Sequence, residues 1–455
     1  MTSDLRGFLE RMRSERKSDL LEIEQEVSPR YETAAILTKL EDKQRTPLLY
    51  FHKVSGTSLP VVTNVAGSMG RLALSLGVGL RDLGTRYAEA VSARVKPALS
   101  DHGPIDENTL LGADIDLGKL PALVYHQDDA AQPYITAGIA VAKDPDTGLE
   151  NLSYHRLMIA GPAKTGIFIE RGKHLDRIYQ KYCAAGQAMP LAVFIGAPPS
   201  WSLGALYSGS PDIEEYDVIG GLLRAPLPVV HTKTQVGLRV PAAAELVLEG
   251  YVPPDERLIE GPFGEFTGYG TGQVETPVFH LTALRFRDQP IFQDIVSGRL
   301  EHLILSMPAI EHRTKEEARR ASENVTGVAL VAPFTAVIAL KKVDDHEPAR
   351  IIESILSGDI YSKHVIVVDD GVDPGDLRQV LSAVALHVQA DKNLTIFSGR
   401  QGTPLDPSCP SSDGKVAKMG IDATTPLRDP RPVTRNRIPA EVLDRIDLAE
   451  ILKKR

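Results

Sequence analysis

Between residues 121 and 325, short apolar runs alternate with glycine and proline, a pattern that excludes a mainly helical fold. Proline removes a backbone donor and glycine permits torsions closed to other residues, so each run has to end in a turn. Strands are expected at 134–142, 165–169, 191–195, 227–231 and 277–286, with one helix from Lys173 to Gln187. Many short strands with such punctuation are typical of a barrel or a sandwich.

On both sides of this region, helices alternate with strands. Up to residue 120, the pattern predicts helices at 5–16 and 31–42 and strands at 47–52 and 59–64, followed by a linker at 96–104. From residue 326, it predicts strands at 336–340 and 364–369 and helices at 348–356 and 376–386. The sequence therefore predicts an α/β protein with regions at 1–120, 121–325 and 326–455.

The chain ends in a predicted helix, from Ala440 to Lys454, with one broad apolar face. Leu443, Ile446, Leu448 and Ile451 make up this face. An apolar face has to be covered, and a partner subunit is a reasonable place for it.

Composition excludes several classes of partner and location. A net charge of −9 argues against nucleic acid or an anionic membrane as the main partner. No run approaches the roughly 18 apolar residues of a membrane-spanning helix, and the start of the chain has no signal-peptide core. Cys183 and Cys409 are too few for a disulfide framework or a cysteine zinc site. We expect a cytoplasmic protein.

The hexapeptide Glu260-Gly-Pro-Phe-Gly-Glu265 is the strongest local indication of chemistry. Its glycines and proline disfavour a helix, so the two glutamates should lie close together across a tight loop. Two neighbouring acids cannot both ionise cheaply, and one of them can then carry a proton at neutral pH. A surface turn with two solvated glutamates fits the hexapeptide equally well.

Several common sites are absent from the sequence. There is no phosphate loop of the Walker type, no helix-borne pair of zinc histidines and no Gly-x-Ser-x-Gly. The glycine-rich segment 268–272 does not follow a strand of a βαβ unit, which argues against a dinucleotide site. Residues 207–211 are interpreted as a polar loop without a function.

Several segments together resemble the UbiD family of decarboxylases. The hexapeptide continues as Phe266-Thr-Gly-Tyr269 in the manner of that family, and further blocks follow the same order and approximate spacing over nearly the whole chain. These further blocks are Asn151-Leu-Ser-Tyr-His-Arg156, Phe168-Ile-Glu-Arg-Gly-Lys-His174, Glu214-Glu-Tyr-Asp-Val-Ile-Gly220, 240–250 and 415–424.

The resemblance implies a fold and a set of cofactors. The fold would be an α/β N-terminal region, a central split β-barrel similar to flavin reductases, and an α/β C-terminal region with a terminal oligomerisation helix. Asn151, His174 and Glu215 would bind Mn²⁺ or Mg²⁺, which suits an amide oxygen, an imidazole and a carboxylate. The metal would bridge to the phosphate of prenylated FMN, with K⁺ nearby. Further cofactor-binding residues implied by the resemblance are Thr136, Ser153, Arg156, Lys173 and Lys363.

The resemblance also implies a catalytic network of Arg156, Glu260 and Glu265. A guanidinium can hold two carboxylates through its fork of donors. Arg156 and Glu260 would stay paired, while Glu265 would protonate the substrate carbon after decarboxylation through a covalent adduct with prenylated FMN. The reaction would be a reversible, non-oxidative decarboxylation of an aromatic, heteroaromatic or α,β-unsaturated carboxylic acid.

Substrate choice does not follow from these motifs. Lys173 could meet a second carboxylate or a polar substituent of the substrate, and His302, His312 and Arg313 are further candidates for its surroundings. A 4-hydroxybenzoate-type decarboxylase of quinone biosynthesis and a non-catalytic cofactor-binding scaffold remain alternatives. A glycosidase-like hydrolase is disfavoured by a single tryptophan and 5% aromatic residues. Expected partners are a flavin prenyltransferase that supplies the cofactor and copies of the chain itself, in a homodimer or homohexamer.

Overall fold

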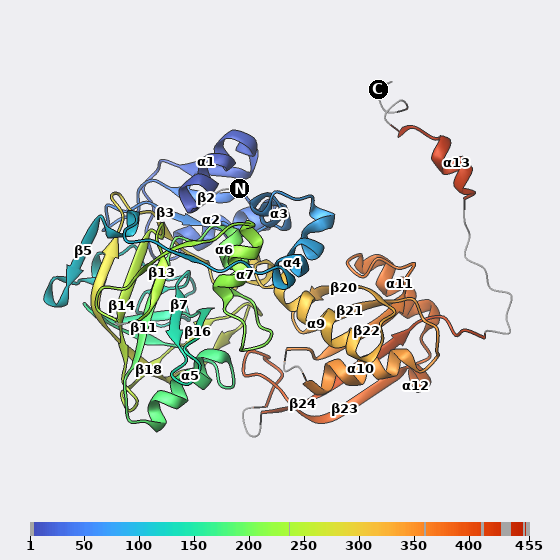
Figure 1. Cartoon of the computed structure of the whole chain (residues 1–455). Coiled ribbons are helices and arrows are strands. Elements are labelled where there is room, and N and C mark those ends of the chain that lie inside the picture. The colour runs from blue at the N-terminus through green and yellow to red at the C-terminus, as the bar shows by residue number, and fades with distance from the viewer. Residues whose placement is uncertain are drawn as a thin grey trace.

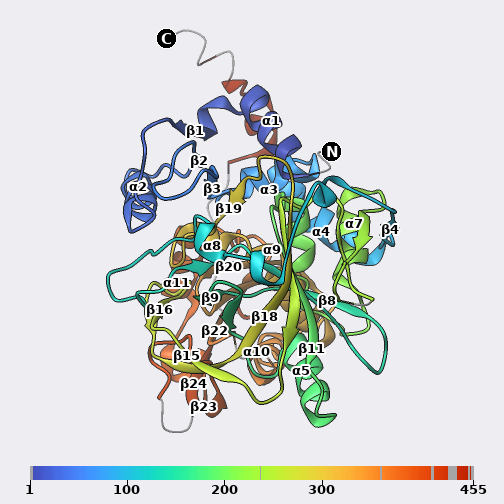
Figure 2. The ribbon, with the colours of Figure 1, turned by 90° about the vertical axis from the view of Figure 1, so that its left-hand side faces the viewer.

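The structure is a computed structural model that describes residues 4–235, 237–358, 361–410, 414–428, 438–448 and 451. Its described part contains several sheets with helices packed against them, a mixed α/β fold (Figure 1). In two views related by 90°, the N-terminal elements lie at one end of the central region (Figure 2). No described helix has the length and apolar character needed to cross a membrane.

The N-terminal region supplies four helices and five strands within its described residues. They are α1 (Leu5–Glu15), β1 (Leu20–Ile23), α2 (Glu32–Glu41), β2 (Leu48–Phe51), β3 (Val61–Thr63), α3 (Met69–Leu76), α4 (Leu83–Ser92), β4 (Ala98–Leu99) and β5 (Asn108–Leu111). The Asp4 side chain caps α1 by accepting a hydrogen bond from the backbone N–H of Gly7. The predicted helices and strands up to residue 64 are confirmed to within two residues at each end.

The central region contains most of the strands. They are β6 (Tyr134–Ile135), β7 (Ile139–Lys143), β8 (Glu150–Tyr154), β9 (Leu157–Gly161), β10 (Lys164–Ile167), β11 (Met189–Ile195), β12 (Pro228–His231), β13 (Arg239–Pro241), β14 (Leu246–Val252), β15 (Arg257–Glu260), β16 (Phe263–Gly264), β17 (Gly270–Thr271), β18 (Val274–Phe286) and β19 (Phe292–Gln293). Its helices are α5 (His174–Ala184), α6 (Pro199–Ala205), α7 (Glu215–Leu223), α8 (Leu300–Ile304) and α9 (Met307–Ala321).

A large sheet organises this region. Its main path runs β6-β9-β10-β18-β14-β11-β7-β8, and β5 and β15 pair with β18 beside that path. Among the described residues, β6 and β8 at the two ends of the path do not pair, so the closure of a split barrel stays a prediction. The 134–142 strand is wrong as one piece, because Thr136 to Gly138 leave the ladder between β6 and β7.

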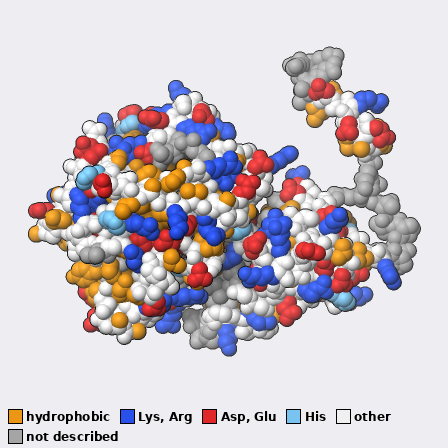
Figure 3. Space-filling model, in the orientation of Figure 1, with side chains coloured by type: hydrophobic (Ala, Val, Ile, Leu, Met, Phe, Trp, Pro, Cys, Tyr) orange, Lys and Arg blue, Asp and Glu red, His pale blue; other side chains and the backbone are white. Residues whose placement is uncertain are grey.

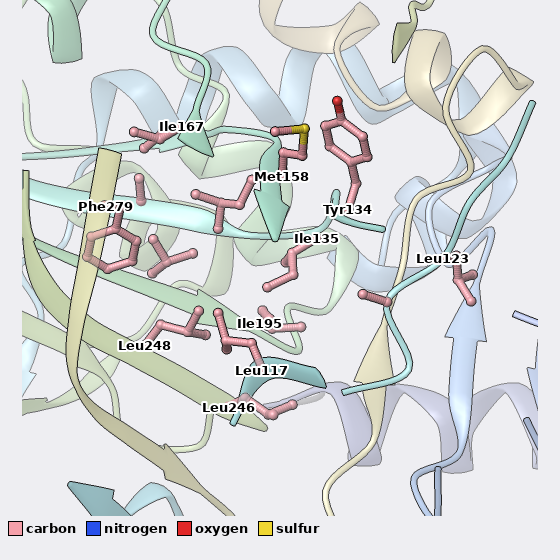
Figure 4. Packing of buried hydrophobic residues seen from close by; sticks show 14 of the residues in the cluster. Leu117, Leu123, Tyr134, Ile135, Met158, Ile167, Ile195, Leu246, Leu248 and Phe279 are labelled. Carbon is pink, nitrogen blue, oxygen red and sulfur yellow. The ribbon is translucent and has the colours of Figure 1, made fainter. Parts of the chain in front are cut away.

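A hydrophobic core fills one side of the large sheet. Phe279, Leu248, Ile195, Leu246 and Leu117 come from four segments of the chain and point into the same space (Figure 4). All five are at most 1% exposed, as expected for side chains that drive folding by leaving water. This packing fixes the strands that carry the polar groups described below.

The C-terminal region forms a five-stranded sheet of order β20-β21-β22-β24-β23. Its elements are β20 (Val325–Ala332), β21 (Thr335–Leu340), α10 (Glu347–Gly358), β22 (His364–Asp369), α11 (Leu377–His387), α12 (Ala390–Asn393), β23 (Leu394–Gln401), β24 (Lys415–Ala423) and α13 (Ala440–Arg445). The parallel pairing of β21 with β22 and of β22 with β24 agrees with the βα alternation of the sequence.

Several strands pair with a strand of a neighbouring region. From the N-terminal region, β4 pairs with β12 and β5 pairs with β18, while β19 of the central region pairs with β3. The boundaries at 120 and 325 therefore stay a prediction, although each region keeps a sheet of its own.

The terminal helix α13 lies apart from the rest of the chain (Figure 1). Leu443 is 60% exposed and Leu448 is 64% exposed, and apolar and charged side chains mix on this segment (Figure 3). The described helix is shorter than predicted, and residues 449, 450 and 452–455 lie outside the described part.

Candidate active site

A cavity of about 580 Å³ opens between the large sheet and the C-terminal sheet. The central region lines it with residues that follow or end strands, among them Arg156, Glu170 and Glu265, and the C-terminal region adds Phe334 and Tyr361. Of the residues predicted for the site, Thr136, Asn151, Ser153, Lys173 and His174 also line it. Residues from distant parts of the sequence thus meet at one hollow.

Arg156 joins the two glutamates of the hexapeptide. It lies between β8 and β9, and its Nε and Nη2 donate to Glu260 Oε1 and Oε2 over 2.8 and 2.9 Å. Its Nη1 donates to Glu265 Oε1. Glu260 is 0% exposed and Glu265 is 7% exposed, which excludes a surface turn with two solvated glutamates.

Two aromatic rings lie close to the guanidinium of Arg156. The Arg156 carbon Cζ lies 4.2 Å from the ring centre of Phe168 and 4.7 Å from that of Phe263. Cation–π contacts of this kind restrict the movement of a guanidinium. The fork of donors is therefore aimed at the glutamates before any substrate binds.

Glu265 holds a proton more tightly than an ordinary glutamate. Burial raises its pKa to about 7; the charge of Arg156 lowers it, and the charges of Glu260 and Glu170 raise it. The neighbouring acid is thus only a secondary cause, behind loss of water. At neutral pH, protonated and ionised Glu265 coexist beside the cavity.

The three predicted metal ligands lie close together: Asn151 and His174 line the cavity, and Glu215, at 1% exposure, is not among its lining residues. Asn151 Nδ2 donates to Glu215 Oε1 over 3.0 Å, and His174 Nδ1 lies 3.8 Å from the same oxygen. Glu215 and His174 are the first residues of α7 and α5, and Asn151 is in β8. In the described part of the chain, no three His, Cys, Asp or Glu side chains form a metal cluster, so any site here depends on the amide.

Of the other residues predicted to bind the cofactor, three line the cavity and one does not. Thr136 Oγ1 donates to buried Asp294 over 3.0 Å, and Ser153 Oγ donates to Asn151 Oδ1 over 3.2 Å. Lys173 is the N-cap residue of α5, with its Nζ 4.3 Å from the ring centre of Tyr361. Lys363 is not among the residues that line the cavity, and its Nζ donates to Asp406 over 2.7 Å.

Of the three further residues predicted to surround the substrate, two line the cavity and one does not. His302 and Arg313 line the cavity. His312, on the same helix as Arg313, instead packs its ring against Tyr87 with 5.6 Å between ring centres. Helical spacing could have indicated this, because adjacent positions on a helix point in different directions.

Sequence reasoning missed part of the cavity wall. The segment 207–211, interpreted as a polar loop, supplies Tyr207, Ser208, Gly209 and Pro211. Tyr361 was also missed, although its hydroxyl donates to Glu170 Oε1 over 2.5 Å, across 191 residues of sequence. No local pattern could have indicated either contribution, since both depend on the packing of the two sheets.

Comparison with known proteins agrees with the resemblance that the sequence motifs indicate. Family models described as the N-terminal, Rift-related and C-terminal domains of UbiD, 3-octaprenyl-4-hydroxybenzoate carboxy-lyase, match residues 12–91, 97–300 and 310–423. The anhydromevalonate phosphate decarboxylase of Methanosarcina mazei is 32% identical over 446 residues, which are 96% of this chain and 99% of that protein.

Solved structures agree over the whole length. The UbiD-class enzyme HmfF from Pelotomaculum thermopropionicum, in complex with FMN, has 35% identity and a TM-score of 0.89, covering 98% of this chain and 99% of its own. An evolved dimeric form of HmfF in complex with prenylated FMN has 33% identity and a TM-score of 0.85, with the same two coverages. Vanillic acid decarboxylase from Sedimentibacter hydroxybenzoicus, in its closed form, has 28% identity and a TM-score of 0.89, covering 100% of this chain and 99% of its own. The chain belongs to the UbiD family of prenylated-FMN-dependent decarboxylases and is a carboxy-lyase of that type.

Proposed function

We propose that this carboxy-lyase removes carbon dioxide reversibly from a small unsaturated carboxylic acid and that Glu265 delivers the replacing proton. The observation that carries the proposal is the Arg156 fork, which fixes Glu260 through two donors and leaves Glu265 at the cavity wall. Because burial raises the pKa of Glu265 to about 7, this group can lose and regain a proton in every turnover.

The cavity wall, together with buried Glu215, offers groups that fit prenylated FMN and a divalent cation. Asn151, His174 and Glu215 provide a mostly hard donor set that suits Mn²⁺ or Mg²⁺. The N-terminus of α5, with Lys173 beside it, offers backbone N–H groups and a positive charge to a phosphate. When bound, prenylated FMN would supply the electron sink for the bond that breaks. K⁺ and the phosphate contact of Lys363 stay predictions.

The proton balance defines what the protein has to do. When a carboxylate leaves as carbon dioxide, the C–C bond breaks, its electron pair stays with the substrate carbon, and one proton has to reach that carbon. Protonated Glu265 gives this proton and is left ionised beside Arg156, whose charge stabilises it. Solvent then returns the proton, because the net reaction consumes one proton per carboxylate. Glu260 holds Arg156 in place throughout.

We expect kcat for decarboxylation to be level below pH 7 and to fall above it. Burial is the main reason that the pKa of Glu265 is about 7, and only its acid form can donate, so kcat should fall about tenfold per pH unit well above that value. Glu170→Gln removes a charge that raises this pKa, and the fall should then begin at lower pH. A kcat profile through neutral pH, measured for both proteins, checks this. A level profile that is the same for both would contradict it.

The cavity favours a substrate with a second anionic or polar group. Lys173 and Arg313 put positive charge on its wall, and Phe266 and Phe334 put aromatic surface beside it. One relative is named for a phosphate-bearing substrate and another for vanillic acid, a substituted aromatic acid. We therefore propose an aromatic, heteroaromatic or α,β-unsaturated acid with a second acidic group. Carbon dioxide release from a panel of such acids, with their singly charged analogues and 4-hydroxybenzoate, tests this choice.

Lys173→Gln should reduce the preference for doubly over singly acidic substrates by at least about tenfold. A hydrogen bond to a charged group contributes about 1.5–3 kcal/mol, and the singly acidic analogue does not make it. The measurement is kcat/KM for both members of a matched pair. Lys181→Gln is the control, because Lys181 lies on α5 but is not among the residues that line the cavity. An unchanged preference in Lys173→Gln would reject a role of this lysine in substrate binding.

We also propose that the chain assembles with copies of itself through its terminal segment. Leu443, Ile446 and Leu448 are each about half exposed or more, at 60%, 49% and 64%. Apolar side chains at such exposure are stabilised when a partner covers them. The evolved form of HmfF is dimeric, which fits a homodimer here, and a homohexamer stays the alternative.

A further inference from the structure

The backbone of Gly264, the residue just before Glu265, is held from two sides. The backbone N–H of Gly264 donates to Asp129 Oδ1 over 2.8 Å. The backbone C=O of Gly264 accepts a hydrogen bond from the Ser297 hydroxyl. Asp129 precedes the large-sheet strand β6, and Ser297 follows β19, so two distant segments meet on one residue.

Asp129 is itself fixed by short local contacts. Its Oδ2 accepts from the backbone N–H of His126 over 3.0 Å and lies 2.9 Å from the Nδ1 of the same residue. The Asp129 side chain is 4% exposed. Next to it, the backbone N–H of Ala130 donates to the C=O of Pro262 over 2.7 Å. The segment 126–130 thus holds the hexapeptide at both Pro262 and Gly264.

The fit between these segments depends on glycine at position 264. A Cβ atom there would lie 2.6 Å from His126 Nδ1 and 2.7 Å from His126 Cε1, well inside contact distance. Any side chain would push the hexapeptide away from Asp129. Ser297 is 2% exposed on the opposite side. A displacement of Gly264 would therefore break its part-buried hydrogen bond to Asp129 or its buried one from Ser297.

We propose that Asp129 and Ser297 are positioning residues that hold the Glu265 carboxyl at the place where it delivers its proton. Asp129 does not line the cavity and touches neither Arg156 nor Glu260 through any hydrogen bond of the described residues. It acts on Glu265 through the backbone of Gly264. The inference rests on the proposed role of Glu265, because a group that transfers a proton has to lie close to the atom that receives it.

The expected effect of losing this support is on kcat. A displacement of about 1 Å in a reacting group can cost up to about 100-fold in rate. Asp129→Ala leaves the Gly264 N–H without its acceptor, and Ser297→Ala leaves the Gly264 C=O without its donor. Each should lower kcat by about 10- to 100-fold with KM nearly unchanged. Asp129→Asn keeps one oxygen that can accept from Gly264 and should lose less than Asp129→Ala.

The test uses the full chain loaded with cofactor, and Asp128→Ala is the matched control. Asp128 is the exposed neighbour of Asp129. The readouts are kcat, KM and the solvent deuterium isotope effect on kcat, which reports how far proton delivery limits turnover. Hydrogen exchange of the peptide that contains Gly264, in the full chain without cofactor, gives a readout apart from activity.

The expected result is faster exchange at the hexapeptide, lower kcat and a larger solvent isotope effect in Asp129→Ala and Ser297→Ala, with Asp128→Ala like wild type. A lower melting temperature with unchanged kcat and isotope effect would overturn the inference and leave these residues a structural role only. If Glu265→Gln itself retained turnover, the proposed function would fail first, so the two failures are distinguishable.

Discussion

Glu265→Gln should leave a folded chain that binds its cofactor and turns over about 100- to 10,000-fold more slowly than wild type. Glutamine has the shape of protonated glutamic acid, and its amide can still meet Arg156, but it has no proton to give at neutral pH. Cofactor binding should be kept, because the candidate metal ligands Asn151, His174 and Glu215 lie on other elements. The measurement is kcat under saturating substrate, with cofactor content measured in the same preparation.

Two further variants sharpen this result. Glu275→Gln removes an exposed glutamate of β18 and should leave turnover unchanged. Glu265→Asp keeps the acid but draws it back by one methylene, and it should fall between wild type and the glutamine variant. A Glu265→Gln enzyme with wild-type turnover would remove Glu265 from the mechanism.

Arg156→Ala should be both inactive and less stable, by about 3–5 kcal/mol if the chain folds. The substitution removes the cation between two buried carboxylates, and Glu260 at 0% exposure then has no charge to offset its own. Arg156→Lys keeps the positive charge, but an ammonium cannot reproduce the fork that meets both oxygens of Glu260. We expect Arg156→Lys to fold better than Arg156→Ala and to remain strongly impaired in kcat.

The pH dependence of this stability loss follows from the charges. The deficit of Arg156→Ala comes from ionised carboxylates without a cation, so it should be largest at high pH. Burial raises the pKa of Glu265 to about 7 even with Arg156 present, and loss of Arg156 raises it further. As pH falls through that range, protonation removes the charge and the deficit should shrink. Denaturant midpoints of both proteins above and below pH 7 check this. A deficit that stays constant with pH would mean that lost packing against Phe168 and Phe263 dominates.

Local sequence patterns predicted single elements well. The strand at 364–369 coincides with β22, and the helix at 376–386 differs from α11 by one residue at each end. Both have strong apolar periodicity and clear start signals, such as the Asp376 side chain that caps α11. The hexapeptide brings its two acids together as predicted, although Glu260 ends β15 and Phe263–Gly264 form β16, so it is not a loop throughout. The family models confirm the resemblance that it carries.

Contacts between segments that are distant in the sequence determine the features that local patterns could not predict. The run 134–142 has strand character throughout, but Gly138 packs where a Cβ would lie 2.8 Å from Val193, and the chain leaves the ladder there. Tyr361 and Glu170 meet only because the C-terminal sheet packs over the cavity. The order of strands around β18, which brings Arg156 to Glu260, depends on such contacts as well. The intrinsic preference of single residues for helix or strand contains no information on which distant segments come into contact.

Native mass spectrometry of the chain co-expressed with a flavin prenyltransferase is the most direct test of the proposed cofactor and function. We expect each chain to carry the added mass of one prenylated FMN and one divalent cation, and the same spectrum reports the number of chains in the assembly. His174→Ala should lose the cation and weaken cofactor retention, while His102→Ala, at an exposed site, should match wild type. A chain that carries no cofactor, purified from cells in which the prenyltransferase is shown to be active, would contradict the proposed function.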